Sequence, residues 1–193
     1  MPQNCYRVKP PAMSNASNEI TEQETKADLP TPPEALFARL DALGIAHRTF
    51  HHPPVYTVEQ AKAQRGEIVG AHIKNLFLRD KKKRMWLVVA LEHRRIDLKS
   101  LGADLRARSL SFASAERLMT YLGVEPGSVT PLAALNDESG AVSVILDRAV
   151  LDHSLVNCHP LVNHMTTALA PGDLLRFLAA VDHEPRLHDF PGS

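Results

Sequence analysis

A lysine in the middle of an apolar stretch is the first residue whose type and position could do chemistry. Lys74 lies within Ala71–Arg79, whose alternation predicts a strand with Lys74 and Leu76 on one face and Asn75 on the other. A strand lysine among apolar neighbours needs a partner or a cleft for its charge. It either extends to solvent from a sheet edge, or points into a pocket and holds a phosphate or a ribose.

A second polar cluster, Asn157-Cys158-His159-Pro160, directly follows a strand-like segment. Such a cluster suits a loop that presents a side chain at the rim of a pocket. Cys158 and His159 cannot form a catalytic dyad within the strand, because adjacent strand residues point to opposite faces. A zinc site would have to gather His153, Cys158, His159 and His164, whose spacings match no tight zinc template. We therefore expect no metal.

A glycine followed by small hydroxyl residues forms a third candidate, the segment Gly127-Ser128-Val129-Thr130-Pro131. Loops of this composition can expose backbone N–H groups to an anion or a carbonyl oxygen. The chain contains no GxSxG, GK[ST], GxGxxG or HExxH motif, so the usual nucleophile, nucleotide and zinc-protease signatures are absent. No cofactor is expected.

The net charge of zero, taken alone, argues against a nucleic-acid partner, but the charge is unevenly distributed along the chain. Residues 31–110 carry fifteen basic and eight acidic side chains, or +7, whereas residues 111–193 carry four and ten, or −6. This asymmetry indicates either one basic face that a polyanion would contact or chance clustering on a solvated surface. The basic residues with candidate roles are Lys81, Lys82 and Arg84 at a hairpin tip, and Arg94 and Arg95.

Short strands and helices must position these residues. The predicted strands span 46–50, 71–79, 85–91, 142–146, 155–158 and 164–169. The predicted helices span 31–44, 57–66, 97–101, 114–122 and 171–181, and capping boxes at 31–34 and 57–60 mark the first two. Strand pairs joined by tight turns and interleaved with short helices predict an α+β fold.

The length of 193 residues predicts one domain. We expect a disordered N-terminal tail at 1–30, a domain at 31–185 and a C-terminal tail at 186–193, with Met13 an alternative start to Met1. Two cysteines exclude a disulfide framework. The chain also lacks a secretory signal and an apolar run of about 20 residues. These features predict a cytoplasmic protein with no membrane partner.

Several motifs occur in a recognisable order: Pro54-Val-Tyr-Thr-Val-Glu-Gln-Ala61, His72-Ile-Lys-Asn-Leu-Phe-Leu-Arg-Asp-Lys81, Leu122-Gly-Val-Glu-Pro-Gly-Ser-Val-Thr-Pro131 and Cys158-His-Pro-Leu-Val-Asn163. With them, residues 31–181 strongly resemble the YbaK/ProX family of aminoacyl-tRNA editing domains. The motifs look most similar to the free-standing ProXp-ala (PrdX-like) branch, which removes alanine from mischarged proline tRNA. The resemblance implies a single YbaK-like domain with a mixed, largely antiparallel sheet flanked by helices.

The resemblance also implies roles for single residues. Lys74 matches the family's essential lysine, which contacts the terminal adenosine or its phosphate and positions the ester, and His159 matches a histidine of the pocket loop. The expected substrate-binding residues are Val55, Tyr56, Asn75, Gly127, Ser128, Val129, Thr130, Asn157 and Pro160. The expected tRNA-binding residues are Lys81, Lys82, Arg84, Arg94 and Arg95. The expected partner is the acceptor end of mischarged tRNA(Pro), and prolyl-tRNA synthetase is a further candidate.

The expected function is trans-editing hydrolysis of Ala-tRNA(Pro). An aminoacyl ester is already activated, so its hydrolysis needs a positioned water and a stabilised oxyanion rather than a strong nucleophile. We expect the substrate's own ribose hydroxyl to assist and the pocket to exclude proline by steric clash. Two alternatives stay open: a deacylase for cysteine- or serine-charged tRNA, and a non-catalytic nucleic-acid-binding module.

Overall fold

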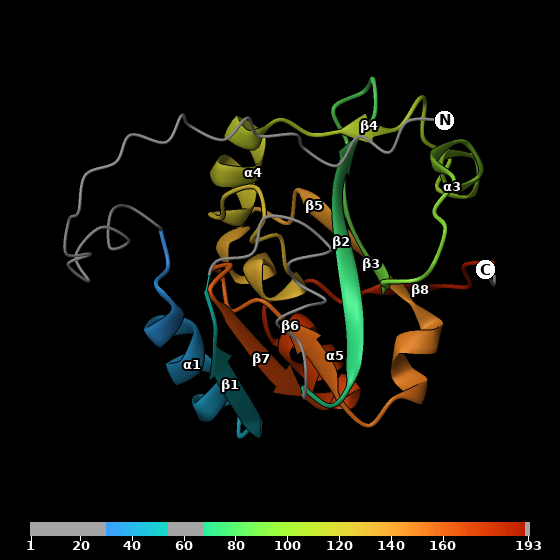
Figure 1. The fold of residues 1–193 in the computed structure, drawn as a ribbon. Helices are drawn as coiled ribbons and strands as arrows, with labels where there is room; N and C mark the ends of the chain where they lie inside the picture. Colours follow the sequence, from blue (N-terminus) through green and yellow to red (C-terminus); the bar gives the residue numbers. More distant parts are fainter. Residues whose placement is uncertain (1–29, 54–67, 192–193) are drawn as a thin grey trace, which may run out of the picture.

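The computed structural model describes residues 30–53 and 68–191 (Figure 1). Within them, eight strands form one sheet in the order β1-β7-β6-β2-β3-β5-β8, with β4 paired to β2. The strands are β1 (His47–His51), β2 (Ala71–Arg79), β3 (Met85–Leu91), β4 (Ser111–Phe112), β5 (Val142–Asp147), β6 (Val156–Cys158), β7 (Met165–Leu169) and β8 (Arg186–His188). The β2–β6, β3–β5 and β5–β8 pairs are parallel and the other four are antiparallel. The predicted α+β class with a mixed sheet is confirmed.

The helices of the described ranges lie between these strands. They are α1 (Pro33–Ala42), α3 (Leu98–Asp104), α4 (Ala115–Leu122) and α5 (Pro171–Ala180), with short 3-10 helices η1 (Pro131–Asn136) and η2 (Arg148–Asp152). The Asp97 carboxylate caps α3 and the Ser114 hydroxyl caps α4, as expected for residues with oxygen-bearing side chains. Gly123 ends α4 at φ +61°, a left-handed conformation that favours glycine. None of the helices in these ranges is long and apolar enough to span a bilayer.

The β2–β3 hairpin is at the centre of the sheet, with both strands in their predicted ranges. The pairing runs from Ile73 opposite Leu91 to Arg79 opposite Met85. All seven residues of β3 are buried, because both faces of the sheet are covered there. In β2, successive side chains alternate between the two faces, so Lys74 shares a face with Leu78 and Asn75 lies on the opposite face.

The two faces of the sheet carry separate apolar clusters. The larger cluster packs against α1, α4 and α5, and includes the fully buried Leu40, Leu122 and Phe177. The smaller one lies under α3 and includes Leu101, Trp86 and Phe190. Figure 1 shows α3 set apart from α1 and α4. Lys74 and Asn75, which are neighbours in β2, therefore have different surroundings.

The predicted capping box at residues 31–34 is wrong. Helix α1 begins at Pro33, Pro32 occupies the cap position, and no side chain caps the helix. The Thr31 hydroxyl instead donates a hydrogen bond to Asn136 Oδ1 at 2.5 Å, so a tertiary contact takes the place of the local one. The second predicted box, at residues 57–60, lies outside the described residues, as do residues 1–29 of the expected N-terminal tail.

Two short strands, β4 and β8, were not predicted from the sequence. Strand β8 pairs in parallel with β5, although its residues fall within the expected tail at 186–193. Phe190, which follows it, is 6% exposed. The ordered part of the chain therefore continues beyond residue 185 and contributes to the smaller apolar cluster.

Candidate active site

The strands β2 and β6 pair over only two residues and then separate. The paired residues are Ala71 with Val156 and His72 with Asn157, in parallel register. Lys74 and His159 each follow the last paired residues by two positions, Lys74 within β2 and His159 just beyond the end of β6. The two residues predicted to be catalytic thus lie on the two segments that diverge at this point, which we call the β2–β6 split.

The Lys74 ammonium is held by a backbone carbonyl. The side chain is half-buried, and its Nζ donates a hydrogen bond to the carbonyl oxygen of Arg94, which follows β3. A half-buried ammonium needs such an acceptor, since water alone no longer solvates it. The contact therefore helps to fix the direction in which the half-buried Lys74 side chain extends.

Asn75 organises the loop at 127–131 from the opposite face of β2. Its Nδ2 donates to the backbone carbonyl of Val129 at 2.9 Å. Gly127 adopts φ +98°, and the buried Thr130 hydroxyl accepts from the backbone N–H of Leu132 at 3.3 Å. Ser128 is also buried. The predicted loop is therefore a fixed structure, and one predicted substrate-binding residue, Asn75, contacts it directly.

Two amide oxygens at the site are buried without a hydrogen-bond partner among the described residues. They belong to Asn75 and Asn157, both predicted to bind substrate. Asn157 is 5% exposed, and its Nδ2 faces the Val69 carbonyl at 3.4 Å. An unsatisfied buried acceptor carries a desolvation cost of about 1–3 kcal/mol, which a donor on a ligand would remove. Both oxygens are candidates to accept from a substrate amine or hydroxyl.

The ring of His159 is oriented by a main-chain contact just beyond β6. Its Nδ1 lies 2.9 Å from the carbonyl oxygen of Met165. A carbonyl only accepts, so Nδ1 carries the hydrogen, and Nε2 is the acceptor atom of the neutral ring. Pro160, next in the chain, is buried and fixes the turn. His159 therefore presents a ring nitrogen suited to accept a hydrogen bond.

The loops at 127–131 and 158–163 are neighbours. A Cβ atom added to Gly127 would lie 3.7 Å from Asn163 Nδ2, so the backbone of one loop faces the side chain of the other. Asn163 was not among the predicted site residues, although it ends the motif that begins at Cys158. Its place in that motif is the signal that could have identified it.

A group of histidines borders His159. The His52 ring lies 6.5 Å from the His159 ring between centroids, and its Nε2 is 2.9 Å from the Thr166 hydroxyl. Burial, and then the nearby His51 and His52, lower the pKa of His164, so that ring favours the neutral form. The sequence contains ten histidines, and spacing alone did not single out His52.

Cys158 lies on the opposite side of β6 from Asn157 and His159. It is buried in the larger apolar cluster, and burial raises the pKa of its thiol to about 12. The thiolate is the nucleophilic form, so Cys158 is inert at neutral pH. Within the described ranges, no three His, Cys, Asp or Glu side chains gather as a metal site would require.

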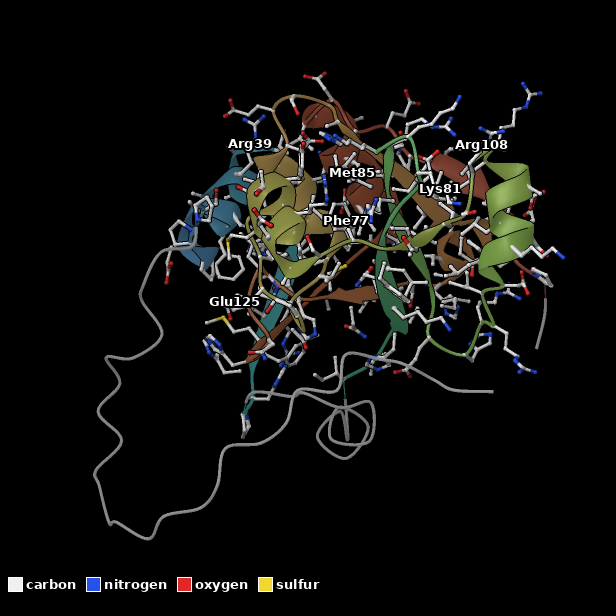
Figure 2. The ribbon with its side chains drawn as sticks, turned by 90° about the horizontal axis from the view of Figure 1, so that it is seen from above. Arg39, Phe77, Lys81, Met85, Arg108 and Glu125 are labelled. Carbon is white, nitrogen blue, oxygen red and sulfur yellow. The ribbon has the colours of Figure 1, made fainter. Side chains whose placement is uncertain are left out.

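The predicted tRNA-binding residues fall into two groups. At the hairpin tip, the Arg84 guanidinium donates to the Arg106 carbonyl at 2.7 Å, and the Lys81 backbone N–H donates to the Arg108 carbonyl at 3.1 Å. Figure 2 shows Lys81 and Arg108 together at one side of the molecule, away from Arg39. We call the exposed set here the tip patch: Lys81, Lys82, Lys83, Arg84, Arg106 and Arg108.

Arg94 and Arg95 form the second group, beyond the other end of β3. Arg95 is exposed, whereas Arg94 is half-buried. The Arg94 Nε lies 3.0 Å from Oδ2 of the buried Asp147. The structure thus places Arg94 in an internal ion pair. Val55 and Tyr56, which were also predicted to bind substrate, lie outside the described residues.

Residues 52–177 match the family model of the aminoacyl-tRNA editing domain. The chain is 41% identical over 148 residues to the prolyl-tRNA editing protein ProX of Acetoanaerobium sticklandii, covering 76% of this chain and 90% of that protein. It is 41% identical over 157 residues to the prolyl-tRNA synthetase associated domain-containing protein 1 of Mus musculus, covering 79% and 92%.

Solved structures share the fold. A protein described as a candidate trans-editing enzyme for prolyl-tRNA synthetase superposes with a TM-score of 0.64 at 19% identity, covering 84% of this chain and 99% of that one. The hypothetical protein APE2540 superposes with a TM-score of 0.65 at 19% identity, covering 80% and 97%. These structures confirm the predicted fold, and the family match and the relatives confirm the predicted family. The chain belongs to the aminoacyl-tRNA editing domain family, the YbaK/ProX family, and is an aminoacyl-tRNA deacylase.

Proposed function

We propose that this deacylase hydrolyses alanyl-tRNA(Pro) in trans, at the β2–β6 split. The observation that carries the proposal is that Lys74 and His159 each lie two residues beyond the last β2–β6 pair, where the two strands diverge. The names of two relatives refer to prolyl-tRNA editing and to prolyl-tRNA synthetase, which supports tRNA(Pro) as the carrier. The preference for alanine comes from the motifs shared with the ProXp-ala branch.

In this proposal Lys74 holds the adenosine end and no side chain attacks the ester. The ammonium, which has three N–H donors, binds the terminal phosphate or ribose while it keeps its contact with the Arg94 carbonyl. A water molecule attacks the ester carbonyl, and the vicinal ribose hydroxyl orients that water. The His159 Nε2 accepts the hydrogen bond from the hydroxyl or the water, since Nδ1 is committed to Met165.

Backbone amides of the two loops stabilise the developing oxyanion. The N–H groups near Gly127 and His159 are the donors in this proposal, because the loops are neighbours and Asn75 holds the first of them through Val129. Such fixed donors stabilise the transition state more than the ground state. The unsatisfied oxygen of Asn75, on the face of β2 that meets the first loop, is suited to accept from the α-amino group.

Selection against proline is steric in this proposal. A site that admits a methyl group excludes a pyrrolidine ring by overlap, which discriminates more strongly than the about 1–3 kcal/mol available from a missing methylene. Glycine and serine fit the same space, so we expect some hydrolysis of both. Selection of the tRNA then needs contacts outside the aminoacyl site, and the tip patch and Arg95 are the proposed contacts with the phosphate backbone that position the tRNA.

A deacylation panel tests this function. Purified protein is incubated with alanyl-, cysteinyl-, seryl- and prolyl-tRNA(Pro), and release of each amino acid is followed under single turnover. We expect fast release of alanine, slower release of serine and no release of proline. Fast release of cysteine with alanine retained would assign the cysteine specificity instead. A protein that binds all four tRNAs and releases nothing would be a binding module.

A further inference from the structure

The position of Lys74 depends on the backbone of a turn that follows β3. The acceptor for its Nζ is the main-chain carbonyl of Arg94. The turn is closed by the Arg94 N–H, which donates to the Leu91 carbonyl at 3.0 Å, while the Glu92 N–H donates to the His72 carbonyl at 2.9 Å. Because this acceptor is a backbone atom, the turn that holds the Arg94 carbonyl helps to hold the lysine.

A buried carboxylate fixes the turn. Asp147, at the end of β5, has a side chain only 1% exposed, and its Oδ2 accepts from Arg94 Nε at 3.0 Å and from the Leu91 N–H at 3.4 Å. Its Oδ1 accepts from the Ala149 N–H at 3.1 Å. The Arg94 side chain is 16% exposed. The pair is therefore shielded from solvent, where such interactions are stronger and more directional than at the surface.

We propose that the Asp147–Arg94 ion pair is a positioning device for Lys74. The carboxylate holds the guanidinium, the guanidinium holds its own backbone in the turn, and the carbonyl of that residue directs the ammonium toward the β2–β6 split. Arg94 and Asp147 are thus positioning residues of the proposed deacylation, on which this inference rests. The assignment differs from the sequence-based prediction that Arg94 contacts tRNA.

Steady-state kinetics on alanyl-tRNA(Pro) separate these two roles. For Arg94→Gln and Asp147→Asn we expect kcat to fall about 10- to 100-fold, the range in which small misplacements of catalytic groups act. KM should stay within about twofold, and the double variant should be no slower than the slower single variant. A rise in KM with unchanged kcat in Arg94→Gln, and no effect of Asp147→Asn, would overturn the proposal in favour of a tRNA contact.

The matched control is an ion pair of the same residue types on the surface. Arg148 Nε lies 2.9 Å from Asp189 Oδ1, with side chains 55% and 76% exposed. Arg148→Gln should leave both kcat and KM unchanged, because exposed pairs contribute little. Thermal unfolding shows whether each variant is folded at the assay temperature. If Asp147→Asn is not folded, Arg94→Gln decides alone, since its side chain is not part of either apolar cluster.

A second readout does not depend on catalysis. Lysines are reductively methylated with ¹³C, and the Lys74 signal is assigned by its absence in Lys74→Arg. Its chemical shift should move in Arg94→Gln and in Asp147→Asn and stay in place in Arg148→Gln. An unmoved Lys74 signal in both variants overturns the positioning role. A wild-type protein that does not hydrolyse alanyl-tRNA(Pro) contradicts the proposed function, while the chemical shift still decides the positioning.

Discussion

Lys74 and His159 serve the proposed chemistry through opposite hydrogen-bonding capacities. The ammonium of Lys74 only donates, whereas the His159 ring, whose Nδ1 faces the Met165 carbonyl, is proposed to accept through Nε2. An ester carries acceptor oxygens and its ribose carries a donor hydroxyl, so the pair matches both. Cys158 supplies no nucleophile, because its thiol is buried and its pKa is raised to about 12.

His159 tests the acceptor role at this scale. For His159→Ala we expect the single-turnover rate on alanyl-tRNA(Pro) to fall about 10²- to 10⁴-fold, the usual contribution of a positioned acid or base. The affinity for tRNA should be unchanged, because the residue contacts no more than the acceptor end. The control is His153→Ala, which removes an exposed histidine from the segment before β6. Equal single-turnover rates for His159→Ala and His153→Ala would show that His159 takes no part in the reaction.

Gly127 tests the conformation of the loop. Its φ of +98° is disfavoured for any residue with a side chain, although a Cβ would find no closer atom than Asn163 Nδ2 at 3.7 Å. Gly127→Ala should therefore destabilise the fold by about 1–3 kcal/mol through backbone strain. Gly172→Ala in α5, where nothing lies within 4 Å and φ is not positive, should stabilise by about 0.4–1 kcal/mol. Denaturant unfolding compares them, and equal shifts would exclude strain.

At the scale of elements, a buried contact between a histidine and a carboxylate joins the end of η1 to the segment after α5. The His183 Nε2 lies 3.1 Å from Asp137 Oδ2 and its Nδ1 lies 2.6 Å from the Val181 carbonyl. The two contacts fix the orientation of the His183 ring. Burial by itself raises the pKa of Asp137, but hydrogen bonds from Ser139, His183 and Val142 outweigh it and lower that pKa below 3.8.

This lowered pKa predicts how stability depends on pH. The contribution of Asp137 is present above pH 3.8, the ordinary carboxyl value, and is lost as the pH falls through the lower folded value. Asp137→Asn should destabilise the fold by about 1.5–3 kcal/mol at pH 7, since the amide loses the charge-assisted hydrogen bonds that the carboxylate accepts. Urea unfolding of both proteins from pH 6 to pH 2 measures this. A difference that stays constant down to pH 2 would contradict the assignment.

The elements that depend on local pattern were predicted well. The β2–β3 hairpin was predicted residue for residue, because the alternation and the charged turn lie in one continuous segment. Strands β4 and β8 were missed, since two or three residues carry no periodicity and their partners are distant in sequence. The cap expected at Thr31 was wrong for a related reason: its hydroxyl bonds to Asn136, far along the chain.

The candidate site shows the same limit. Lys74, Asn75 and the two loops could be predicted from motifs. The ion pair that engages Arg94 could not, because Asp147 lies in another strand and only the fold brings them together. His52 could not be singled out among the ten histidines of the sequence, because only the fold brings its ring near that of His159.

At the scale of the whole molecule, exposed basic residues gather in one patch although the net charge is zero. The fold gathers the tip patch from the hairpin tip and the segment after α3, whereas Arg39 lies on another side of the molecule (Figure 2). A concentrated basic face can bind phosphate even on a neutral protein. Residues 111–193, with their net −6, balance the basic residues in the sum over the chain.

Salt dependence tests the tip patch. For Lys82→Ala we expect weaker binding of tRNA(Pro), and a slope of log K against log salt that is smaller by about one, as for one lost phosphate contact. Arg39→Ala, an exposed cation away from the patch, is the control and should change neither quantity. The measurement is tRNA binding between about 50 and 200 mM salt. Parallel slopes for Lys82→Ala and the wild type would place the tRNA elsewhere.

The most direct test of the central claim compares Lys74→Ala with Lys99→Ala, which removes an exposed lysine of α3. Single-turnover hydrolysis of alanyl-tRNA(Pro) and binding of uncharged tRNA(Pro) are measured for both variants and the wild type. If the reaction takes place at the β2–β6 split, the rate of hydrolysis falls by about 10²-fold or more in Lys74→Ala. Both variants should still bind tRNA and stay folded. Unchanged hydrolysis in Lys74→Ala would contradict that claim.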